Sequence, residues 1–299
     1  MIHNDYISII YGDKITMSEA ELKAKLQELE QREFRPAEGV DPAELIPAML
    51  QYIGTTDSHL RDEFIYAAFC EWILDDELLA KEQLRTLLPV LLDDRHLLCG
   101  LGEKDTDSVF TRSFSVLVIP LLLTAHYTRG LFSADEINMV KQKLLYYLEN
   151  ERDRRGYVQG KGWAHTIAHT ADALSDLVLC PETDRPIMLE ILDAIRGVIC
   201  VKDICYIHSE EERLVTAVIE VIKKRQVSEH DIIQWIQSFS VEALAVITFP
   251  ERQMIRTNVK NFLQSLYFRL EWEELLNGFE TAIDQTLRSI SPFVKKEEA

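Results

Sequence analysis

The chain has 299 residues, of which 47% are hydrophobic and 27% are charged. This composition is typical of a globular protein with a large core, and it excludes a disordered chain. Fifty acidic and thirty-two basic side chains give a formal net charge of -18. Because that charge repels polyphosphate chains and anionic membrane surfaces, we expect neither nucleic acid nor a membrane as the partner.

The cysteines and the first residues bear on location. The five cysteines are odd in number and form no CxxC pair, so neither a disulfide framework nor a zinc knuckle is indicated. Residues 1–6 carry no basic segment followed by an apolar run, which predicts no secretory signal. The longest apolar run, residues 116–125, is shorter than the ~20 residues that span a bilayer, which predicts a core helix. We therefore expect free thiols in a cytoplasmic protein.

Turn-forming residues are few, with nine prolines and eleven glycines, so we expect long helices joined by short connections. The β-branched runs are also short, which indicates little strand. The predicted class is therefore all-α. In chain order, start signals and apolar periodicity predict helices at residues 18–32, 81–98, 133–149, 186–198, 228–239 and 272–290.

A repeat with a period near fifty residues runs through this pattern. The tripeptide Thr-Asp-Ser occurs at residues 56–58 and again at 106–108, before apolar helical segments. Aspartate and serine are good N-caps, because their short side-chain oxygens accept a bond from a first-turn N–H. We therefore expect Asp57 and Asp107 to cap corresponding helices. At the same interval, further helix starts are predicted at residues 160–163, 209–212 and 257–258.

Repeated helix pairs of this length resemble the HEAT and armadillo class, in which stacking of neighbouring pairs closes the core. We predict an α-solenoid, or α/α superhelix, over residues 46–290. Residues 1–45 would form a lead-in with one helix, and residues 291–299 a frayed tail.

Residues 161–178 carry the most informative set of polar side chains. On a helix at about 100° per residue, His165, His169, Asp172 and Asp176 share one stripe, and Trp163 occupies the opposite side. The flanking residues are small, which predicts that neighbouring helices lie close and that the stripe lines a groove.

Three roles are open for this stripe. It forms a structural hydrogen-bonded set, such as His169 with Asp172, or it binds a ligand or acts as an acid–base site without metal. In the third role, His165, His169 and Asp172 hold a divalent metal, because two histidines at i and i+4 reach one ion and the carboxylate lies on the same face. The glutamate of the metalloprotease HExxH pattern is missing.

A basic cluster at residues 152–161 precedes the stripe in an otherwise acidic chain. Arg155 and Lys161, beside a helix N-terminus, would suit an anion such as phosphate or carboxylate. The segment is not a Walker A loop, since the first glycine, the Lys-Ser/Thr ending and the preceding strand are missing. The alternative is a solvated turn whose arginines pair with acids.

Two arginines complete the predicted groove. Arg112 lies beside the apolar stretch 114–123 and must find partners if it is buried; pairing with an acid is its simpler role. In a solenoid, equivalent helices of adjacent repeats stack, which would bring Arg61, Arg112 and His165 onto neighbouring ridges. The candidate groove or ligand-binding residues are thus Arg61, Asp107, Arg112, Arg155, Lys161, Trp163, His165, His169, Asp172 and Asp176.

Three segments resemble a bacterial family, the domain of unknown function numbered 2785. They are Arg-Asp at residues 61–62, the stretch 102–115, and above all Gly-Lys-Gly-Trp-Ala-His-Thr-Ile-Ala-His-Thr-Ala-Asp-Ala-Leu at residues 160–174. The resemblance extends over about residues 45–240. It implies a helical bacterial protein of Gram-positive type with no established activity, and it assigns no catalytic residues.

Two functions are compatible with these features. We predict a binding module that holds a protein, a peptide or a small anionic ligand in a polar concave groove, with a basic partner favoured by the acidic surface. The alternative is a hydrolase, either metal-dependent or using a His/Asp acid–base set, that acts on an anionic substrate. No GxSxG nucleophile motif supports the alternative.

Overall fold

The structure is a computed structural model that describes residues 17–75 and 78–294. The described residues form twelve α-helices, one 3-10 helix, one π-helical segment and one two-stranded hairpin. Helix covers well over half of them, which confirms the all-α class. Residues 1–6, which bear on the secretory signal, and residues 295–299 of the predicted tail lie outside the described residues.

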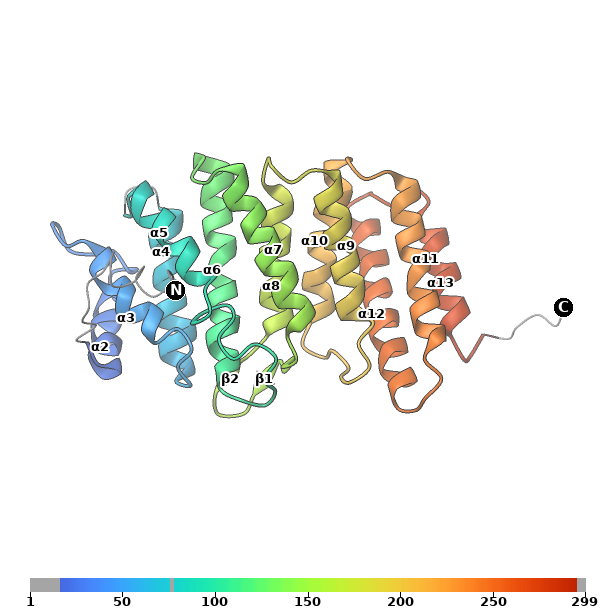
Figure 1. The fold of residues 1–299 in the computed structure, drawn as a ribbon, viewed down its shortest axis with the longest axis horizontal. Coiled ribbons are helices and arrows are strands. Elements are labelled where there is room, and N and C mark those ends of the chain that lie inside the picture. The colour runs from blue at the N-terminus through green and yellow to red at the C-terminus, as the bar shows by residue number, and fades with distance from the viewer. Residues whose placement is uncertain (1–16, 76–77, 295–299) are drawn as a thin grey trace. The chain divides into compact units, whose positions relative to one another are not determined.

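The chain divides into two compact units, Met1–Cys180 and Pro181–Ala299, a division that the sequence analysis does not predict. Each unit is built almost entirely from helices (Figure 1). Unit 1 contains α2 (Glu19–Glu30), η1 (Pro42–Leu45), α3 (Ile46–Gln51), the π-helical η2 (His59–Tyr66), α4 (Ala67–Leu74), α5 (Lys81–Leu91), α6 (Ser108–Arg129), α7 (Ala134–Asn150), the strands β1 (Tyr157–Val158) and β2 (Gly162–Trp163), and α8 (Thr166–Leu179). Unit 2 contains α9 (Arg185–Ile199), α10 (Glu210–Lys224), α11 (Glu229–Ala245), α12 (Glu251–Trp272) and α13 (Phe279–Ile290).

Helix α6 is the centre of unit 1. It packs against α4, α5 and α8, and within the described residues it is the one helix long and apolar enough to cross a membrane. Because 83% of its most apolar window is buried inside the protein, it is the core helix that the run at 116–125 predicts. It ends at Gly130, whose left-handed conformation (φ 65°) closes the last turn.

Several helices begin where their capping residues predict. Ser18 and Ser133 each form a capping box, in which the side chain accepts from the backbone N–H three residues on. Asp184 and Ser228 cap α9 and α11, since each side chain accepts from the backbone N–H three residues on. The predicted helix at 81–98 is shorter, because α5 ends at Leu91.

The fifty-residue register predicts some helix starts and misses others. The start predicted at 209–212 is confirmed, because α10 begins at Glu210. The helical segments assigned to this register begin at residues 59, 108, 166, 210 and 251. Consecutive starts are therefore separated by unequal numbers of residues. Asp57 caps as predicted, since its Oδ1 accepts from the backbone N–H of Leu60 at 3.1 Å. Asp107 occupies the N-cap position of α6, but its side chain makes no capping bond. The start predicted at 257–258 is wrong, because these residues lie inside α12.

Unit 2 is held by two pairs of packed helices, α10 with α12 and α11 with α13. At its centre the rings of Trp235, Phe239 and Phe262 contact one another, with centroids 5.0 to 6.0 Å apart. The indole N–H of Trp235 donates to the carbonyl of Leu192 at 2.8 Å. The predicted helix at 272–290 is really the end of α12 and, after a turn, α13.

Candidate functional site

The segment with the predicted stripe begins as a hairpin, and only then becomes a helix. β1 and β2 pair antiparallel, with Tyr157 opposite Trp163. Gly160 and Gly162 have φ angles of +78° and +82°, which glycine adopts readily and a right-handed helix does not allow. The prediction that a helix starts at 160–163 is therefore wrong, and α8 begins at Thr166.

The hairpin is docked onto the first turns of α6. Val158 packs against a buried cluster of Val109, Phe110 and Ala164. The fully buried Ser113 hydroxyl donates to the carbonyl of Ala164. Apolar contact and a buried hydrogen bond thus fix the same segment, so its position is tied to the core helix of unit 1.

Arg61 lies on η2 and is completely buried. Its Nη1 donates to the carbonyl of Thr55 at 2.7 Å, and its Nη2 donates to the carbonyl of Lys161 at 2.8 Å. The guanidinium lies 4.4 Å from the ring centroid of Phe110 and 4.5 Å from that of Phe114. Burial lowers the pKa of Arg61, and the aromatic rings and carbonyls stabilise its charge instead of water. This arginine therefore holds the hairpin in place.

Asp62 and Gly162 complete this contact. The Oδ1 of Asp62 lies 2.8 Å from the Nε of Arg61, although the two atoms are not aligned as a hydrogen bond. Burial raises the pKa of Asp62 to about 6, against the opposing effect of Arg61. A Cβ on Gly162 would lie 2.7 Å from the Cβ of Ser58 and 2.8 Å from the Nη2 of Arg61. Only glycine fits between η2 and the hairpin.

Arg112 forms a fully buried ion pair with Glu151. Its Nε and Nη2 donate to the two carboxylate oxygens at 2.7 and 3.1 Å. Its Nη1 donates to the carbonyls of Cys99 and Gly100 and to the hydroxyl of Ser108, at 2.7 to 3.1 Å. Burial alone would lower the pKa of Arg112, but the hydrogen bonds and the charge of Glu151 outweigh it and raise the pKa. The pair is a structural element with every donor nitrogen satisfied.

Both cations of the predicted anion site face carboxylates. Lys161 Nζ donates to the two oxygens of Asp107 at 2.6 and 2.7 Å, which explains why this aspartate does not cap α6. Arg155 makes a two-point pair with the fully buried Asp153 at 2.6 and 2.8 Å. This geometry matches the alternative that the loop is a turn whose cations pair with acids. A bound anion would have to displace Asp107 or Asp153.

The predicted stripe is wrong at His165 and Trp163. His165 is the N-cap residue of α8 in the left-handed conformation (φ 47°), so it does not share a helical face with His169. The two imidazole rings still meet, with centroids 5.7 Å apart. Trp163 stacks on His165 at 4.3 Å and so accompanies the histidines instead of opposing them. His165 and His169 are only 8% and 5% exposed, which rules out an ordinary solvated face.

The hydrogen bonds of His169 determine where its proton lies. Its Nδ1 is 2.8 Å from the hydroxyl oxygen of Ser113 and 3.2 Å from the carbonyl oxygen of that residue. Since the Ser113 hydroxyl donates to the carbonyl of Ala164, both oxygens can only accept from His169. We therefore assign a hydrogen to Nδ1 of His169.

The two carboxylates of the predicted stripe, Asp172 and Asp176, both lie on α8. Asp176 Oδ1 accepts from Thr124 and Tyr127 on α6 at 3.2 and 3.3 Å. Asp172 is half-buried on α8. Among the described residues, His165, His169 and Asp172 are not a group whose ligand atoms all lie within 4.8 Å of one another. The predicted metal ligands would have to move together to bind one ion.

The structure thus gathers two groups from the predicted residues. Arg61 and His169 contact Phe114, and Trp163 and His165 continue from His169 as a chain of ring contacts, whereas Arg112, Arg155, Lys161 and Asp107 form ion pairs. Of the acids in these pairs only Asp107 is a predicted site residue, although the alternation of acids and bases at residues 151–155 indicates ion pairing. The missed residues are Asp62, Ser113, Glu151, Asp153 and Tyr157.

Comparisons with known proteins identify the family. No curated protein and no solved structure matches the chain. Residues 97–268 match the family described as protein of unknown function (DUF2785). The match covers more than half of the chain and contains α6, the hairpin and α8. The chain therefore belongs to the DUF2785 family, as the segments at 102–115 and 160–174 predict.

Proposed function

We propose that this protein is a helical-repeat binding module, and that its hairpin binds a basic segment of a protein partner. The observation that carries the proposal is an exposed aromatic pair on a hairpin held by buried ion pairs. Tyr157 is 50% exposed and Trp163 is 38% exposed, and their rings meet edge to face with centroids 5.1 Å apart.

Such a pair suits the recognition of a cationic side chain. Tryptophan and tyrosine are the aromatic residues most often found at the energetic centres of protein interfaces. Their ring faces attract lysine or arginine by about 0.5–2 kcal/mol, depending on how dry the contact is. Because His165 stacks on Trp163 from the buried side, the indole is held in one orientation.

The rigid support of the hairpin also favours binding. Arg61 bonds to the backbone of Lys161, and Thr166 bonds to the backbone carbonyl of Asp153. The N–H of His165 donates to the carbonyl of Arg155 at 3.0 Å. A site that is already ordered loses little conformational entropy when its partner arrives.

Charge favours a basic partner over an acidic one. The net charge of the chain is -18, and the exposed side chain of Asp105 lies 3.8 Å from Arg155 at the base of the hairpin. Long-range attraction of this kind raises the association rate of an oppositely charged segment. The same charge keeps nucleic acid and anionic membranes away, and five free cysteines agree with a reducing, cytoplasmic location.

The HEAT-like solenoid remains part of this proposal. Within unit 1, α6 packs against both α4 and α8, and within unit 2, α10 packs against α12 and α11 against α13. Contact between alternate helices is the packing expected when helix pairs stack. The polar concave groove predicted from the sequence would then be the surface on which the basic segment continues beyond the hairpin.

The hydrolase alternative is less well supported. Ser113 beside His169 is the contact that would favour it, because a serine activated by histidine is a common nucleophile. However, Ser113 is fully buried and its hydroxyl donates to a backbone carbonyl. Arg155 and Lys161, which would hold an anionic substrate, are both paired with carboxylates.

A peptide selection tests the binding proposal. A random peptide library is selected on the intact protein, and recovered peptides are titrated against wild-type and variant proteins at two salt concentrations. We expect peptides rich in lysine and arginine, an affinity at least about tenfold lower for Trp163→Ala, and weaker binding at high salt. Trp272→Ala is the matched control, because Trp272 is also exposed, at 71%, but lies at the end of α12.

Two results would contradict the proposal. One is a set of selected peptides with no excess of basic residues. The other is equal binding by wild type and Trp163→Ala while both give the same helical circular dichroism spectrum. A loss of affinity in Trp272→Ala instead would move the binding surface to unit 2.

A further inference from the structure

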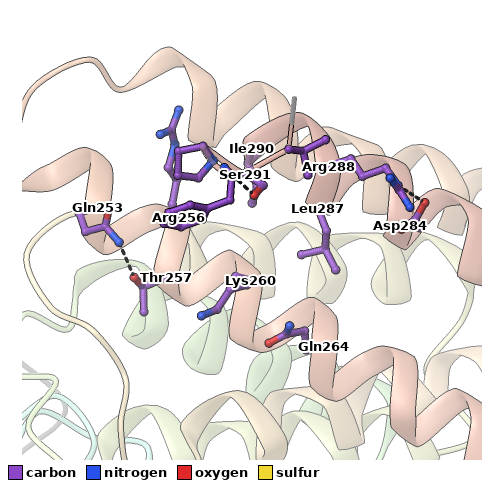
Figure 2. A pocket seen from close by; sticks show the side chains of 13 residues that line it. Gln253, Arg256, Thr257, Lys260, Gln264, Asp284, Leu287, Arg288, Ile290 and Ser291 are labelled. Atoms are coloured by element: carbon purple, nitrogen blue, oxygen red, sulfur yellow. Dashed lines mark hydrogen bonds and ion pairs between the residues drawn. The ribbon is translucent and has the colours of Figure 1, made fainter. Parts of the chain in front are cut away.

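Unit 2 contains a pocket between α12 and α13, far along the chain from the hairpin. Its volume is about 430 Å³, within the range of small-molecule sites. Figure 2 shows the side chains of Arg256, Thr257, Lys260 and Gln264 along α12, and those of Leu287, Ile290 and Ser291 at the end of α13. The walls therefore come from two antiparallel helices of the same unit.

Two cations of this pocket have no carboxylate partner within the described part of the chain. Arg256 and Lys260 are four residues apart on α12, so they lie on one face of the helix. The Nε of Arg256 is buried from solvent and has no acceptor. By contrast, Arg288 is paired with Asp284 at 2.6 Å. Like charges at this spacing destabilise a helix, and in a chain with a net charge of -18 acids were available to compensate them.

Apart from the Arg288–Asp284 ion pair, the rest of the lining is apolar or neutral. Leu287, Ile290 and Phe293 contribute hydrocarbon surface, and Gln253 and Thr257 contribute amide and hydroxyl groups. The Gln253 amide donates weakly to Thr257 at 3.5 Å, so both groups can turn toward a ligand. The α12 wall carries two uncompensated cations, and the opposite wall offers hydrocarbon beside the Arg288–Asp284 pair. A ligand with one anionic and one apolar part matches these two surfaces.

We propose that this pocket binds a small organic anion, with a single carboxylate or phosphate group attached to a short apolar chain. Arg256 is the recognition residue, because its planar guanidinium offers donors at the spacing of two carboxylate or phosphate oxygens. Lys260 adds a second positive charge one turn away. Leu287 and Ile290 cover the apolar chain. A polyanion is a poorer fit, since the pocket offers only these two uncompensated cations.

The test is a set of titrations on the full chain by calorimetry and thermal unfolding. The probes are octanoate and octyl phosphate, with octanol and inorganic phosphate as the matching halves of the ligand. We expect one or both of the octyl anions to bind and raise the unfolding temperature, and to bind at least about tenfold more tightly than either half alone. The difference between octanoate and octyl phosphate identifies the preferred head group.

Variants assign the binding to this pocket. Arg256→Gln with Lys260→Gln should lower the affinity for the octyl anion at least about tenfold. Arg252→Gln is the matched control, because Arg252 is an exposed cation one turn earlier on α12 that does not line the pocket. It should change the affinity less than twofold. Lys260→Gln alone, at an exposed position, should weaken binding and keeps the test open if the double variant unfolds.

The proposal fails if neither octyl anion binds at millimolar concentration. It also fails if octanol binds as tightly as octanoate, or if the double variant keeps the wild-type affinity. Because Trp163 lies in unit 1, its replacement should leave octyl-anion binding unchanged. This outcome separates the pocket from the proposed function of the hairpin.

Discussion

Basic side chains lie both around the hairpin of unit 1 and in the pocket of unit 2. Around the hairpin, Arg112, Arg155 and Lys161 are paired with acids, whereas Arg256 and Lys260 in the pocket have no carboxylate partner within the described part of the chain. Arg112 is fully buried and every donor nitrogen has an acceptor. Arg256 is half-buried, and its Nε has no acceptor among the described residues. The difference teaches that a dense basic cluster in a sequence does not mark an anion site by itself. What matters is whether nearby acids already compensate the charge.

The energetic reason lies in desolvation. Moving a guanidinium out of water costs several kcal/mol, and a buried carboxylate with good geometry recovers most of that cost. Once the pair has formed, a ligand must break it before it can bind. A half-exposed cation on a pocket wall has no such competitor, so a ligand anion gains the full interaction.

The largest expected difference in stability is that between the variants in which Arg112 or Arg256 is replaced. Arg112→Ala leaves the carboxylate of Glu151 buried without its partner, and should lower the free energy of unfolding by about 3–5 kcal/mol. Arg256→Ala removes a cation beside Lys260 and should change it by less than about 1 kcal/mol. Urea denaturation followed by circular dichroism measures both. Comparable losses in the two variants would show that the pocket arginine is also structural.

A pair of glycine substitutions measures how tightly the hairpin is docked. Gly162→Ala introduces a Cβ at 2.7 Å from the Cβ of Ser58 and 2.8 Å from Arg61 Nη2, so we expect a loss of about 2–4 kcal/mol. Gly160→Ala carries the same backbone strain, since its φ is +78°, but a Cβ there meets nothing within 4 Å. It should cost only about 1 kcal/mol. Equal losses in thermal or urea unfolding would mean that the close approach to η2 contributes nothing.

The smallest expected effect is a pH dependence specific to the hairpin contact. The pKa of Asp62 is about 6 in the folded protein, against a reference value of 3.8. Between these values the folded state binds a proton that the unfolded state does not, so this group makes the protein less stable as the pH rises from about 4 to 6. We expect an effect on the order of 1–3 kcal/mol, because each unit of pKa difference corresponds to about 1.4 kcal/mol.

Asp62→Asn isolates this contribution, since other carboxylates titrate in both proteins. The unfolding free energy of wild type minus that of the variant should fall across pH 4 to 6 and stay constant above it. A difference that rises with pH would mean that the Arg61 ion pair outweighs burial. The corresponding difference for Arg256→Ala should be flat, because arginine does not titrate in this range.

Much of the fold could be predicted from local sequence signals. The serine caps at Ser18 and Ser133 and the apolar run of α6 each act within a few residues of themselves, so their outcome is independent of distant packing. The family could also be predicted from a local signal, because the segment at 160–174 identifies it. The fifty-residue register misses the start at 160–163 because the hairpin precedes α8, and it misses the start at 257–258 because α12 already begins at Glu251.

The candidate site could also be predicted only in part. The sequence by itself indicated several of the residues that gather near the hairpin, since Arg61 and His169 meet at Phe114 and Trp163 joins them through His165. Only the tertiary structure decided what each one does. Glu151 reaches Arg112 across 39 residues, and Arg61 bonds to Lys161 across 100. Whether a charge is compensated depends on such long-range neighbours, because the interaction that offsets desolvation acts through space and not along the chain.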